Sequence, residues 1–476
     1  MTLLTKYLFV YLYLLLVMGG AFVVSKRFRN NEISRNIIHI CAGWSWVLYK
    51  LFFPATIHPV LISCSFVLLT VATTKMKVRF VERENGSLGT VYYNLSMLVM
   101  AVLGYRDPLR FDVFGVAMVC LCCGDAAANI IGSRYGTRRI YKKKSMQGTL
   151  ACFVACVLGM LILKGFFGVG LHVWEICSLA VLCAATELFA GDYDNIAIPA
   201  VVYAAAYILL TGESLPHLLL SAAVGGFMFG ISVKFRVLNL PASYLLFVLI
   251  FVLYYFGGLK SYLSLMLLFC VIIGAEKCLR GKTEKIFSSM NKEYGARNER
   301  QLIANCLTAV VAVAAYGITK SEMFLVAYFA TIAETFGDSA ASDVGVLSKA
   351  EPLDICTFKP VPRGVSGGVS ALGTGAALVI CLYSGAIYLC VYGADLRGLL
   401  IILVSSFAGI MLDSVLGSKF QAQYQCGVCA KRTEQERHCQ MPTKLVKGSR
   451  SLDNTRVNLI CNVFSCVLAC LLMGIS

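Results

Sequence analysis

Long apolar segments recur from one end of this 476-residue chain to the other, and they limit its fold more than any other feature. Only 14% of the residues are charged, whereas soluble domains carry about a quarter. A helix satisfies its own backbone hydrogen bonds in lipid, so continuous apolar segments of this length predict membrane-spanning helices. The expected fold class is an all-α polytopic integral membrane protein.

We expect about sixteen transmembrane helices, arranged as two related bundles. The expected spans are 7–24, 38–53, 57–74, 91–105, 111–133, 148–168, 173–190, 196–212, 216–233, 241–258, 261–279, 301–318, 323–341, 367–392, 398–418 and 457–474. A turn-rich break at 211–216 separates the two bundles. It predicts one domain of residues 1–212 and a second of residues 213–476.

The distribution of positive charge supports this arrangement. If the segment after the first span is cytoplasmic and the sides alternate, 34 of the 42 Lys and Arg residues fall on the cytoplasmic side. Such a bias is typical of cytoplasmic loops. We therefore interpret the net charge of +16 as membrane orientation and not as nucleic-acid binding.

One short pattern occurs in each half of the chain. Residues 123–132 read C-G-D-A-A-A-N-I-I-G and residues 336–345 read F-G-D-S-A-A-S-D-V-G. Each copy ends an apolar segment and is followed by a basic, glycine-containing loop. A carboxylate in a membrane segment is costly and indicates a functional site. Two matching copies predict two related sites, both facing the cytoplasm.

The first half combines a carboxylate with a basic loop, as a nucleotide site would. We expect Asp125 to bind a divalent cation that bridges nucleotide phosphates. The loop 134–144 carries six cations and no anion, which suits a triphosphate or, alternatively, simple membrane orientation. The other candidates are Arg35, Gly132, Lys143, Lys144, Ser145 and Gly148 for phosphate, and Glu187, Asp194 and Asn195 for catalysis, metal or nucleotide.

Several of these residues have a structural alternative. Arg35 either meets a phosphate or anchors its helix at the membrane interface. Gly132 and the alanines after Asp125 form a small face that suits helix packing as well as ligand approach. We expect Asp194 to be a second metal ligand or the base for an alcohol.

The first half resembles the phytol kinase and dolichol kinase family of polyprenol kinases. The matching features are Arg35 with His39, the run C-G-D-A-A-A-N-I-I-G-S-R-Y-G, the run K-K-S-M-Q-G-T, and the group from Glu187 to Pro199. The resemblance covers about residues 30–210. It implies phosphorylation of an isoprenoid alcohol, typically from CTP, with a divalent metal ion.

The second half carries a denser set of acidic residues. Glu334 and Asp338 are four residues apart and share a helix face, so we expect this pair to hold Mg²⁺ and act in catalysis. Asp343 falls off that face and is assigned to the following loop. Metal candidates Asp413 and Asp453, and phosphate or nucleotide candidates Ser342, Asp343, Lys359, Arg363, Gly364, Gly367, Gly368, Asn454 and Asn458, complete the set.

The second half resembles the family of plant phytyl-phosphate kinase and the transmembrane-protein-19-like proteins. The matching runs are R-x-x-x-Q-x-x-A-N, A-E-T-F-G-D-S-A-A-S-D-V-G, F-K-P-V-P-R-G-V-S-G-G-V-S-x-L-G-T, L-D-S-x-L-G and D-N-T-R-V-N. The resemblance covers about residues 215–475. It implies addition of a second phosphate to an isoprenyl monophosphate.

A cysteine–histidine group lies in the polar loop before the last expected span. Cys426, Cys429, His438 and Cys439 form a C-x-x-C…H-C pattern. Four such ligands make a structural Zn²⁺ site, the alternative being unliganded cysteines in a reducing compartment.

Together these features predict a bifunctional membrane kinase of the endoplasmic reticulum or another endomembrane. It would convert an isoprenoid alcohol to its monophosphate and then to its diphosphate, with CTP or ATP as donor and Mg²⁺. A lipid-phosphate transporter or flippase, or a chain with one active half, are the alternatives. The sequence leaves the oligomeric state open.

Overall fold

The computed structural model describes residues 1–28, 31–75, 89–142, 144–211, 215–235, 237–289, 299–363, 365–393, 395–429, 432–433, 436–439 and 441–474. Helices dominate it, so the chain is an all-α integral membrane protein as predicted. The chain forms two compact units, unit 1 (Met1–Leu218) and unit 2 (Leu219–Ser476). Their boundary falls close to the break expected at 212. The functional assignment of the two parts stays a prediction.

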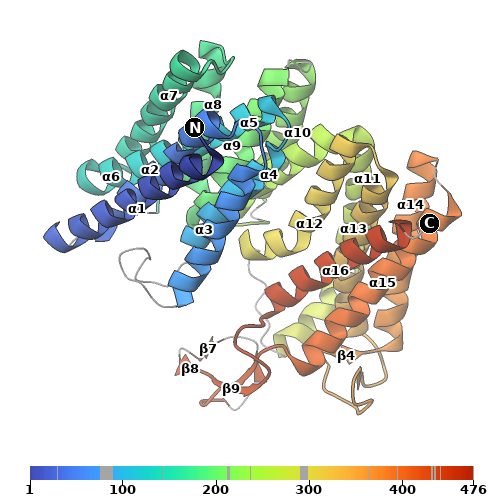
Figure 1. Cartoon of the computed structure of the whole chain (residues 1–476). Helices are drawn as coiled ribbons and strands as arrows, with labels where there is room; N and C mark the ends of the chain where they lie inside the picture. Colours follow the sequence, from blue (N-terminus) through green and yellow to red (C-terminus); the bar gives the residue numbers. More distant parts are fainter. Residues whose placement is uncertain are drawn as a thin grey trace. The chain divides into compact units, whose positions relative to one another are not determined.

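Unit 1 contains nine helices and a short hairpin among its described residues (Figure 1). The helices are α1 (Leu3–Phe28), α2 (Asn31–Phe52), α3 (His58–Lys75), α4 (Gly89–Leu103), α5 (Pro108–Val119), α6 (Ala126–Tyr135), α7 (Met146–Phe167), α8 (Val173–Phe189) and α9 (Asp194–Thr211). A π-helical turn, Cys120–Asp125, joins α5 to α6, and a 3₁₀ turn, Gly191–Tyr193, precedes α9. The strands β1 (Arg139–Tyr141) and β2 (Lys144–Ser145) pair in the loop before α7.

Unit 2 is built around one central helix. Its helices are α11 (Leu240–Ser289), α12 (Glu299–Thr319), α13 (Glu322–Gly345), α14 (Ala371–Tyr392), α15 (Leu396–Lys419) and α16 (Asn454–Gly474), while α10 (Leu215–Lys234) crosses the unit boundary. Helix α13 packs against α12, α14, α15 and α16. The motif-bearing helix therefore lies at the centre of the unit (Figure 1).

Short strands shape the loops of unit 2. The strands β3 (Leu353–Asp354) and β4 (Gly368–Val369) pair in the loop before α14. The loop before α16 contains β5 (Gln423–Gln425), β6 (Arg432–Thr433), β7 (Arg437–His438), β8 (Met441–Pro442) and β9 (Lys444–Lys447). Strand β5 pairs with β6 and β9, and β7 pairs with β8. The expected span 367–392 begins later than predicted, because β4 occupies its first residues.

The described residues contain nine helical segments long and apolar enough to cross a membrane. Three shorter apolar helices add His58–Ala72, Gly89–Leu103 and Leu219–Lys234. Each expected span lies largely within a described helical segment. The spans 241–258 and 261–279 both fall within α11, which has a non-helical break at Gly258 (φ 68°). The exact count of sixteen spans stays a prediction.

Each unit has its own aromatic core. Trp46, Tyr49 and Phe111 are fully buried in unit 1, and Tyr328, Phe329 and Tyr388 are fully buried in unit 2. Many large apolar residues of α1, α7 and α14 are instead exposed on the outside of the bundles. An apolar exterior around a packed interior is expected for helices that face lipid.

Candidate active sites

A cavity of about 120 Å³ in unit 1 combines two kinds of lining. Its apolar side chains come from α1 to α4 and include Leu14, Val17, Met18, Phe66, Leu69 and Met97. Its polar side chains are Arg35, Asn36, Ser45, Thr70, Asn94, His39, Asp125, Asn129 and Asn195, together with tyrosine hydroxyls. A mainly apolar pocket with a few convergent polar groups is the usual form of a small-molecule site.

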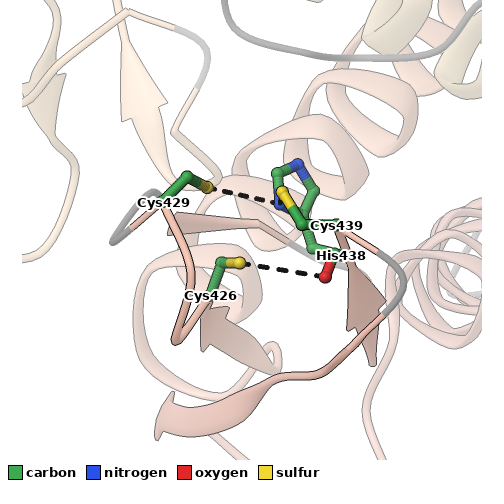
Figure 2. Close-up of side chains that lie close together, drawn as sticks. All are labelled: Cys426, Cys429, His438 and Cys439. Carbon is green, nitrogen blue, oxygen red and sulfur yellow. Dashed lines mark hydrogen bonds between the residues drawn. The ribbon is translucent and has the colours of Figure 1, made fainter.

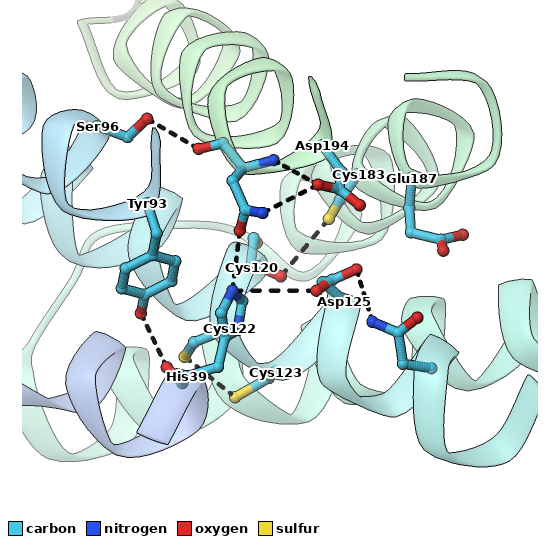
Figure 3. A network of polar contacts seen from close by, with 12 residues as sticks. His39, Tyr93, Ser96, Cys120, Cys122, Cys123, Asp125, Cys183, Glu187 and Asp194 are labelled. Carbon is cyan, nitrogen blue, oxygen red and sulfur yellow. Dashed lines mark hydrogen bonds and ion pairs between the residues drawn. The ribbon is translucent and has the colours of Figure 1, made fainter. Parts of the chain in front are cut away.

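Asp125 is held in the wall of this cavity from two sides. Its side chain is buried and ends the π-helical turn. The Asn129 side chain, one helical turn later, donates to Asp125 Oδ1 at 3.1 Å. His39 Nε2 lies 3.9 Å from Asp125 Oδ2 (Figure 3). Single π-turns inside α-helices are frequent at functional sites, so this geometry fits the role predicted for Asp125.

Asp194 and Asn195 connect the start of α9 to the same network. Asp194 Oδ1 accepts hydrogen bonds from the backbone and side-chain nitrogens of Asn195, at 2.8 and 3.0 Å. Asn195 Oδ1 contacts His39 Nε2 at 2.9 Å. Asp194 is 3% exposed. These contacts bring residues 39, 125, 194 and 195, far apart in the sequence, into one polar group (Figure 3).

Lys144 supplies the cation of this group. It pairs with Glu187, which α8 contributes and which is 1% exposed. Burial by itself lowers the pKa of the Lys144 ammonium, but the carboxylates of Glu187, Asp125 and Asp194 outweigh that effect and raise its pKa above the ordinary value. Lys144 therefore stays charged beside the three carboxylates that were predicted as site residues.

The remaining candidates of unit 1 divide into two groups. Arg35 lines the cavity. Ser145 caps α7, because its hydroxyl accepts the Gly148 backbone N–H at 3.2 Å, so that N–H is already paired. Gly132 of α6 packs against Ser145 and Gly148, where α6 crosses α7. Phosphate contact by Gly132, Ser145 and Gly148 stays a prediction, and Lys143 lies outside the described residues.

A larger and more polar cavity, about 350 Å³, lies in unit 2. Its lining includes the predicted residues Asp338, Ser342, Asp343, Arg363, Gly367, Gly368, Asp413 and Asn454. The assignment of Asp343 to a loop was wrong, because α13 continues to Gly345 and carries Asp343 into the cavity wall. The structure thus gathers segments that are more than a hundred residues apart in the sequence.

Glu334 has no hydrogen-bond partner for its Oε2 atom among the described residues. It is 2% exposed and lies one turn before Asp338 on α13. A buried carboxyl oxygen without a partner is costly unless a cation or proton satisfies it. Its environment fits the metal role predicted for it, although it does not itself line the larger cavity.

The loop before α14 is fixed by an aspartate that the sequence analysis missed. Asp354 Oδ1 accepts from the backbone nitrogens of Cys356 and Thr357 at 3.0 and 2.9 Å, and Oδ2 accepts from the Ser418 hydroxyl at 2.7 Å. These hydrogen bonds, chiefly the one from Ser418, lower the pKa of Asp354 to about 2. Gly367 has φ +86° and lies against the Ser418 backbone, where a side chain would collide.

Some loop candidates lie away from the cavity. Lys359 is exposed and outside the lining, and its backbone carbonyl accepts the Asp354 N–H at 2.9 Å. Arg363 reaches the cavity and donates to the Lys349 carbonyl at 3.1 Å. Gly364 lies outside the described residues.

The start of α16 carries the last candidates. Asp453 is exposed and accepts the Arg456 backbone N–H at 2.9 Å, so it caps α16 and does not line the cavity. Asn454 lines the cavity, and Asn458 donates to Asn305 of α12 at 3.2 Å. The metal role predicted for Asp453 is therefore not supported by its position.

The two units repeat one helix crossing. A Cβ built on Gly132 would lie 3.2 Å from Ser145 Oγ and 3.5 Å from Gly148 Cα. In unit 2, a Cβ on Gly345 would lie 3.2 Å from Ser370 Oγ and 3.5 Å from Gly373 Cα. Ser370 also caps α14 through the Gly373 N–H, as Ser145 caps α7. This match supports the prediction of two related bundles.

Neither acidic set forms three ligand atoms within 4.8 Å of one another in the described part of the chain; the groups that do are rich in cysteine. Mg²⁺ usually takes one or two carboxylates and completes its shell with water and substrate phosphates. The hard oxygen donors Asp125 with Asp194, and Asp338 with Asp413, fit that requirement. Buried Glu334 adds an unpaired oxygen.

Other polar contacts of unit 1 were missed. Ser96 of α4 donates to the Asn195 carbonyl at 2.8 Å, and the Tyr93 hydroxyl donates to the His39 carbonyl at 2.8 Å. The sequence held no signal for these two residues, because Ser96 lies between Leu95 and Met97 and Tyr93 lies between Tyr92 and Asn94, outside any recognisable motif. Asn129 was visible as the residue four positions after Asp125, on the same helix face.

The comparisons agree with the motifs. A family profile described as integral membrane protein DUF92 matches residues 223–466. Protein PGR of Arabidopsis thaliana is 32% identical over 194 residues, which cover 36% of this chain and 66% of that protein. The probable phytol kinase 1, chloroplastic, of Glycine max is 28% identical over 227 residues, with coverage of 40% and 74%.

A dolichol kinase, sec59 of Schizosaccharomyces pombe, is 30% identical over 101 residues, with coverage of 20% and 19%. No solved structure matches. The resemblance to phytol and dolichol kinases predicted from the motifs is thereby confirmed. Because the matching profile spans just over half of the 476 residues, the chain belongs to the DUF92 family of integral membrane proteins.

Proposed function

We propose that the chain is a membrane-embedded prenol kinase whose two units act in sequence. Unit 1 would convert an isoprenoid alcohol to its monophosphate, and unit 2 would convert that monophosphate to the diphosphate. The names of the phytol kinase and dolichol kinase relatives support the lipid-kinase class. The donor would be CTP or ATP, and we place both sites toward the cytoplasm of an endomembrane.

The observation that carries the proposal is the mixed lining of the unit 1 cavity. The apolar residues of α1, α3 and α4 suit a prenyl chain, and the group around Asp125 suits phosphate chemistry. In the transfer, the alcohol oxygen attacks the γ-phosphorus and the bond from phosphorus to the bridging oxygen breaks. The nucleoside diphosphate leaves with that oxygen, and the hydroxyl proton is released to water. Such a reaction needs positioning and charge neutralisation more than covalent catalysis.

Each unit has residues that would hold Mg²⁺. In unit 1 these are Asp125 and Asp194, and in unit 2 they are Glu334, Asp338 and Asp413. The ion would neutralise phosphate charge when bound. In unit 1, Lys144 contributes a fixed positive charge among the carboxylates. In unit 2, Arg363 and the Gly367 backbone line the polar cavity and would provide donors, whereas the Gly368 N–H already donates to the Val365 carbonyl at 3.1 Å.

Matched Asp→Asn variants test the proposal. With purified chain in lipid vesicles, labelled nucleotide and prenols of several lengths, Asp125→Asn should lose alcohol phosphorylation and keep monophosphate phosphorylation. Asp338→Asn should lose monophosphate phosphorylation and keep alcohol phosphorylation. Loss of a metal-binding carboxylate removes several kcal/mol of transition-state stabilisation, so each loss should be at least about 100-fold.

Two helix caps provide the controls. Asp107 caps α5 and Asp395 caps α15, and each accepts a backbone N–H that Asn also accepts. Asp107→Asn and Asp395→Asn should keep both activities. If Asp125→Asn and Asp338→Asn both phosphorylate at the parental rate, the kinase proposal is wrong. If only one of them loses activity, only that unit is catalytic.

A further inference from the structure

We propose that the loop between α15 and α16 holds a structural Zn²⁺ ion through Cys426, Cys429, His438 and Cys439. The ligand atoms of these four residues all lie within 4.8 Å of one another. Figure 2 shows the three thiols and the imidazole turned toward a common point. The inference is independent of the proposed kinase activity, because none of these residues lines either cavity.

The strands of the loop bring the ligands together. Cys426 follows β5 directly, and Cys429 lies in the turn after it. His438 ends β7, whose partner β8 returns the chain, while β5 is held between β6 and β9. Two ligands thus come from a C-x-x-C turn and two from a hairpin, as in many tetrahedral zinc sites.

The spacing of the ligand atoms fits tetrahedral zinc. His438 Nδ1 lies 3.4 Å from Cys429 Sγ and 3.3 Å from Cys439 Sγ. With Zn–S near 2.3 Å and Zn–N near 2.0 Å, a tetrahedron has an N···S edge of about 3.5 Å. The Val428 backbone N–H donates to Cys426 Sγ at 3.4 Å, and the same sulfur lies 3.8 Å from the His438 carbonyl oxygen, so Cys426 faces the His438 strand (Figure 2).

The backbone at Cys439 explains how neighbouring residues serve one ion. Cys439 has φ +51°, a left-handed conformation that is uncommon outside glycine. This turn of the chain brings the Cys439 thiol to the same side as the His438 imidazole (Figure 2). Strained conformations of this kind persist where surrounding bonds maintain them, and metal ligation would supply such bonds.

The site would stabilise a loop with little apolar core of its own. Cys426 is buried, but Cys429 and Cys439 are exposed and all four positions are polar or thiol-bearing. The Gln421 side chain, just before β5, donates to Ser366 at 3.2 Å and to Asn454 at 3.4 Å, and both of these residues line the unit 2 cavity. Zinc would therefore hold β5 and Gln421 in place beside that cavity.

Metal content of the full-length chain tests the site. Protein purified in detergent without chelators should contain about one zinc ion per molecule, measured by inductively coupled plasma mass spectrometry. Cys429→Ser with Cys439→Ser should lower that content at least fivefold, whereas Cys390→Ser, at an exposed cysteine of α14, should leave it unchanged. Retention of zinc by the double variant would overturn the assignment.

Cobalt substitution provides a second measurement that needs no variant. Unaltered chain loaded with Co²⁺ should show the visible bands of a tetrahedral thiolate site, and added Zn²⁺ should abolish them. Peptide mass spectrometry should find Cys426 and Cys429 without a disulfide. Absence of both zinc and the cobalt bands, or a Cys426–Cys429 disulfide in freshly purified chain, would show that the cluster does not bind metal.

Discussion

Lys144 and Glu187 form a pair whose structural and functional roles can be separated. Glu187 is almost completely buried, and the side chain of Lys144 is 27% exposed. Removal of one partner of a buried pair leaves the other charge uncompensated, whereas replacement of both by apolar residues is often neutral. The stability of the single and double variants therefore measures the structural role of the ion pair. Their kinase activity measures the role of the Lys144 charge in the site.

We predict that Lys144→Met lowers the free energy of unfolding by about 3 kcal/mol. The double variant Lys144→Met with Glu187→Leu should recover most of that loss and remain inactive toward prenols, because the charge among the carboxylates is missing. Thermal unfolding in detergent and the kinase assay measure the two effects. A single variant as stable as the parent would mean that the pair does not form.

Asp354 leads to a prediction about pH. Its pKa in the folded chain is about 2, below the ordinary value of 3.8. A lowered pKa means that its stabilising effect is present above the ordinary pKa and is lost only as the pH falls toward 2. Between pH 5 and 8, Asp354 should therefore hold the loop before α14 with constant strength.

Limited proteolysis with trypsin after Arg363 measures this effect, because Lys359 precedes proline and trypsin does not cleave there. Asp354→Asn weakens charge-assisted hydrogen bonds worth about 2 kcal/mol together, so cleavage should accelerate at least tenfold. The ratio of the cleavage rate of Asp354→Asn to that of the parent should be the same at pH 5 and pH 8. The control Asp395→Asn, at a helix cap outside this loop, should be cleaved like the parent.

At the scale of helices, the repeated crossing makes two glycines necessary. A Cβ on Gly148 would lie 2.9 Å from the Ala128 carbonyl oxygen, and one on Gly373 would lie 2.7 Å from the Ala341 carbonyl oxygen. Backbone atoms cannot move aside as a flexible side chain does. An added methyl group must push α6 from α7, or α13 from α14.

We therefore predict that Gly148→Ala and Gly373→Ala each destabilise the chain by about 1–3 kcal/mol, measured by thermal unfolding. Gly165 on α7 and Gly375 on α14 have nothing within 4 Å of an added Cβ. Alanine at these two positions should be neutral or slightly stabilising, because alanine favours helices over glycine. Equal effects at all four positions would contradict the packing argument.

The sequence predicted the helices well and the loops poorly, for a physical reason. A span must be long and apolar, so each expected span left a clear pattern. Strands of two to four residues such as β3 and β4 leave none, and the hydrogen bonds of Asp354 depend on a fold that brings Ser418 near. Asp343 was misplaced because the end of α13 has no strong stop signal before Gly345.

For the whole molecule, the chain divides into two units that each contain a cavity with carboxylates. The turn-rich break at 211–216 lies close to the boundary between the units, and the assignment of a function to each of them stays a prediction. The contacts that assemble each site could not be predicted from the sequence. They join α2 to α9 in unit 1, and in unit 2 they join the loop before α14 to α15 and to Gln421, which in turn contacts α16.

Because each unit holds its own site, inactive variants should complement one another. Vesicles that contain both Asp125→Asn and Asp338→Asn chains should convert a prenol to its diphosphate, although neither variant alone should. The monophosphate must then diffuse through the bilayer from one chain to another. Product analysis over time, with each variant alone as control, measures this transfer; failure of the mixture would show that both reactions require one intact chain.

The π-helical turn at Cys120–Asp125 has a consequence for how unit 1 can vary. A turn of this kind accommodates one residue more than an α-helical turn, and one residue corresponds to about 100° of rotation. The face of α6 that packs on α7 is therefore rotated about the helix axis relative to the face of α5 that packs on the aromatic core. Deletion of a single residue from 120–124 would convert the π-helical turn to an α-helical turn and remove this rotation. The Asp125 carboxylate would then turn away from His39, although no other amino acid had changed.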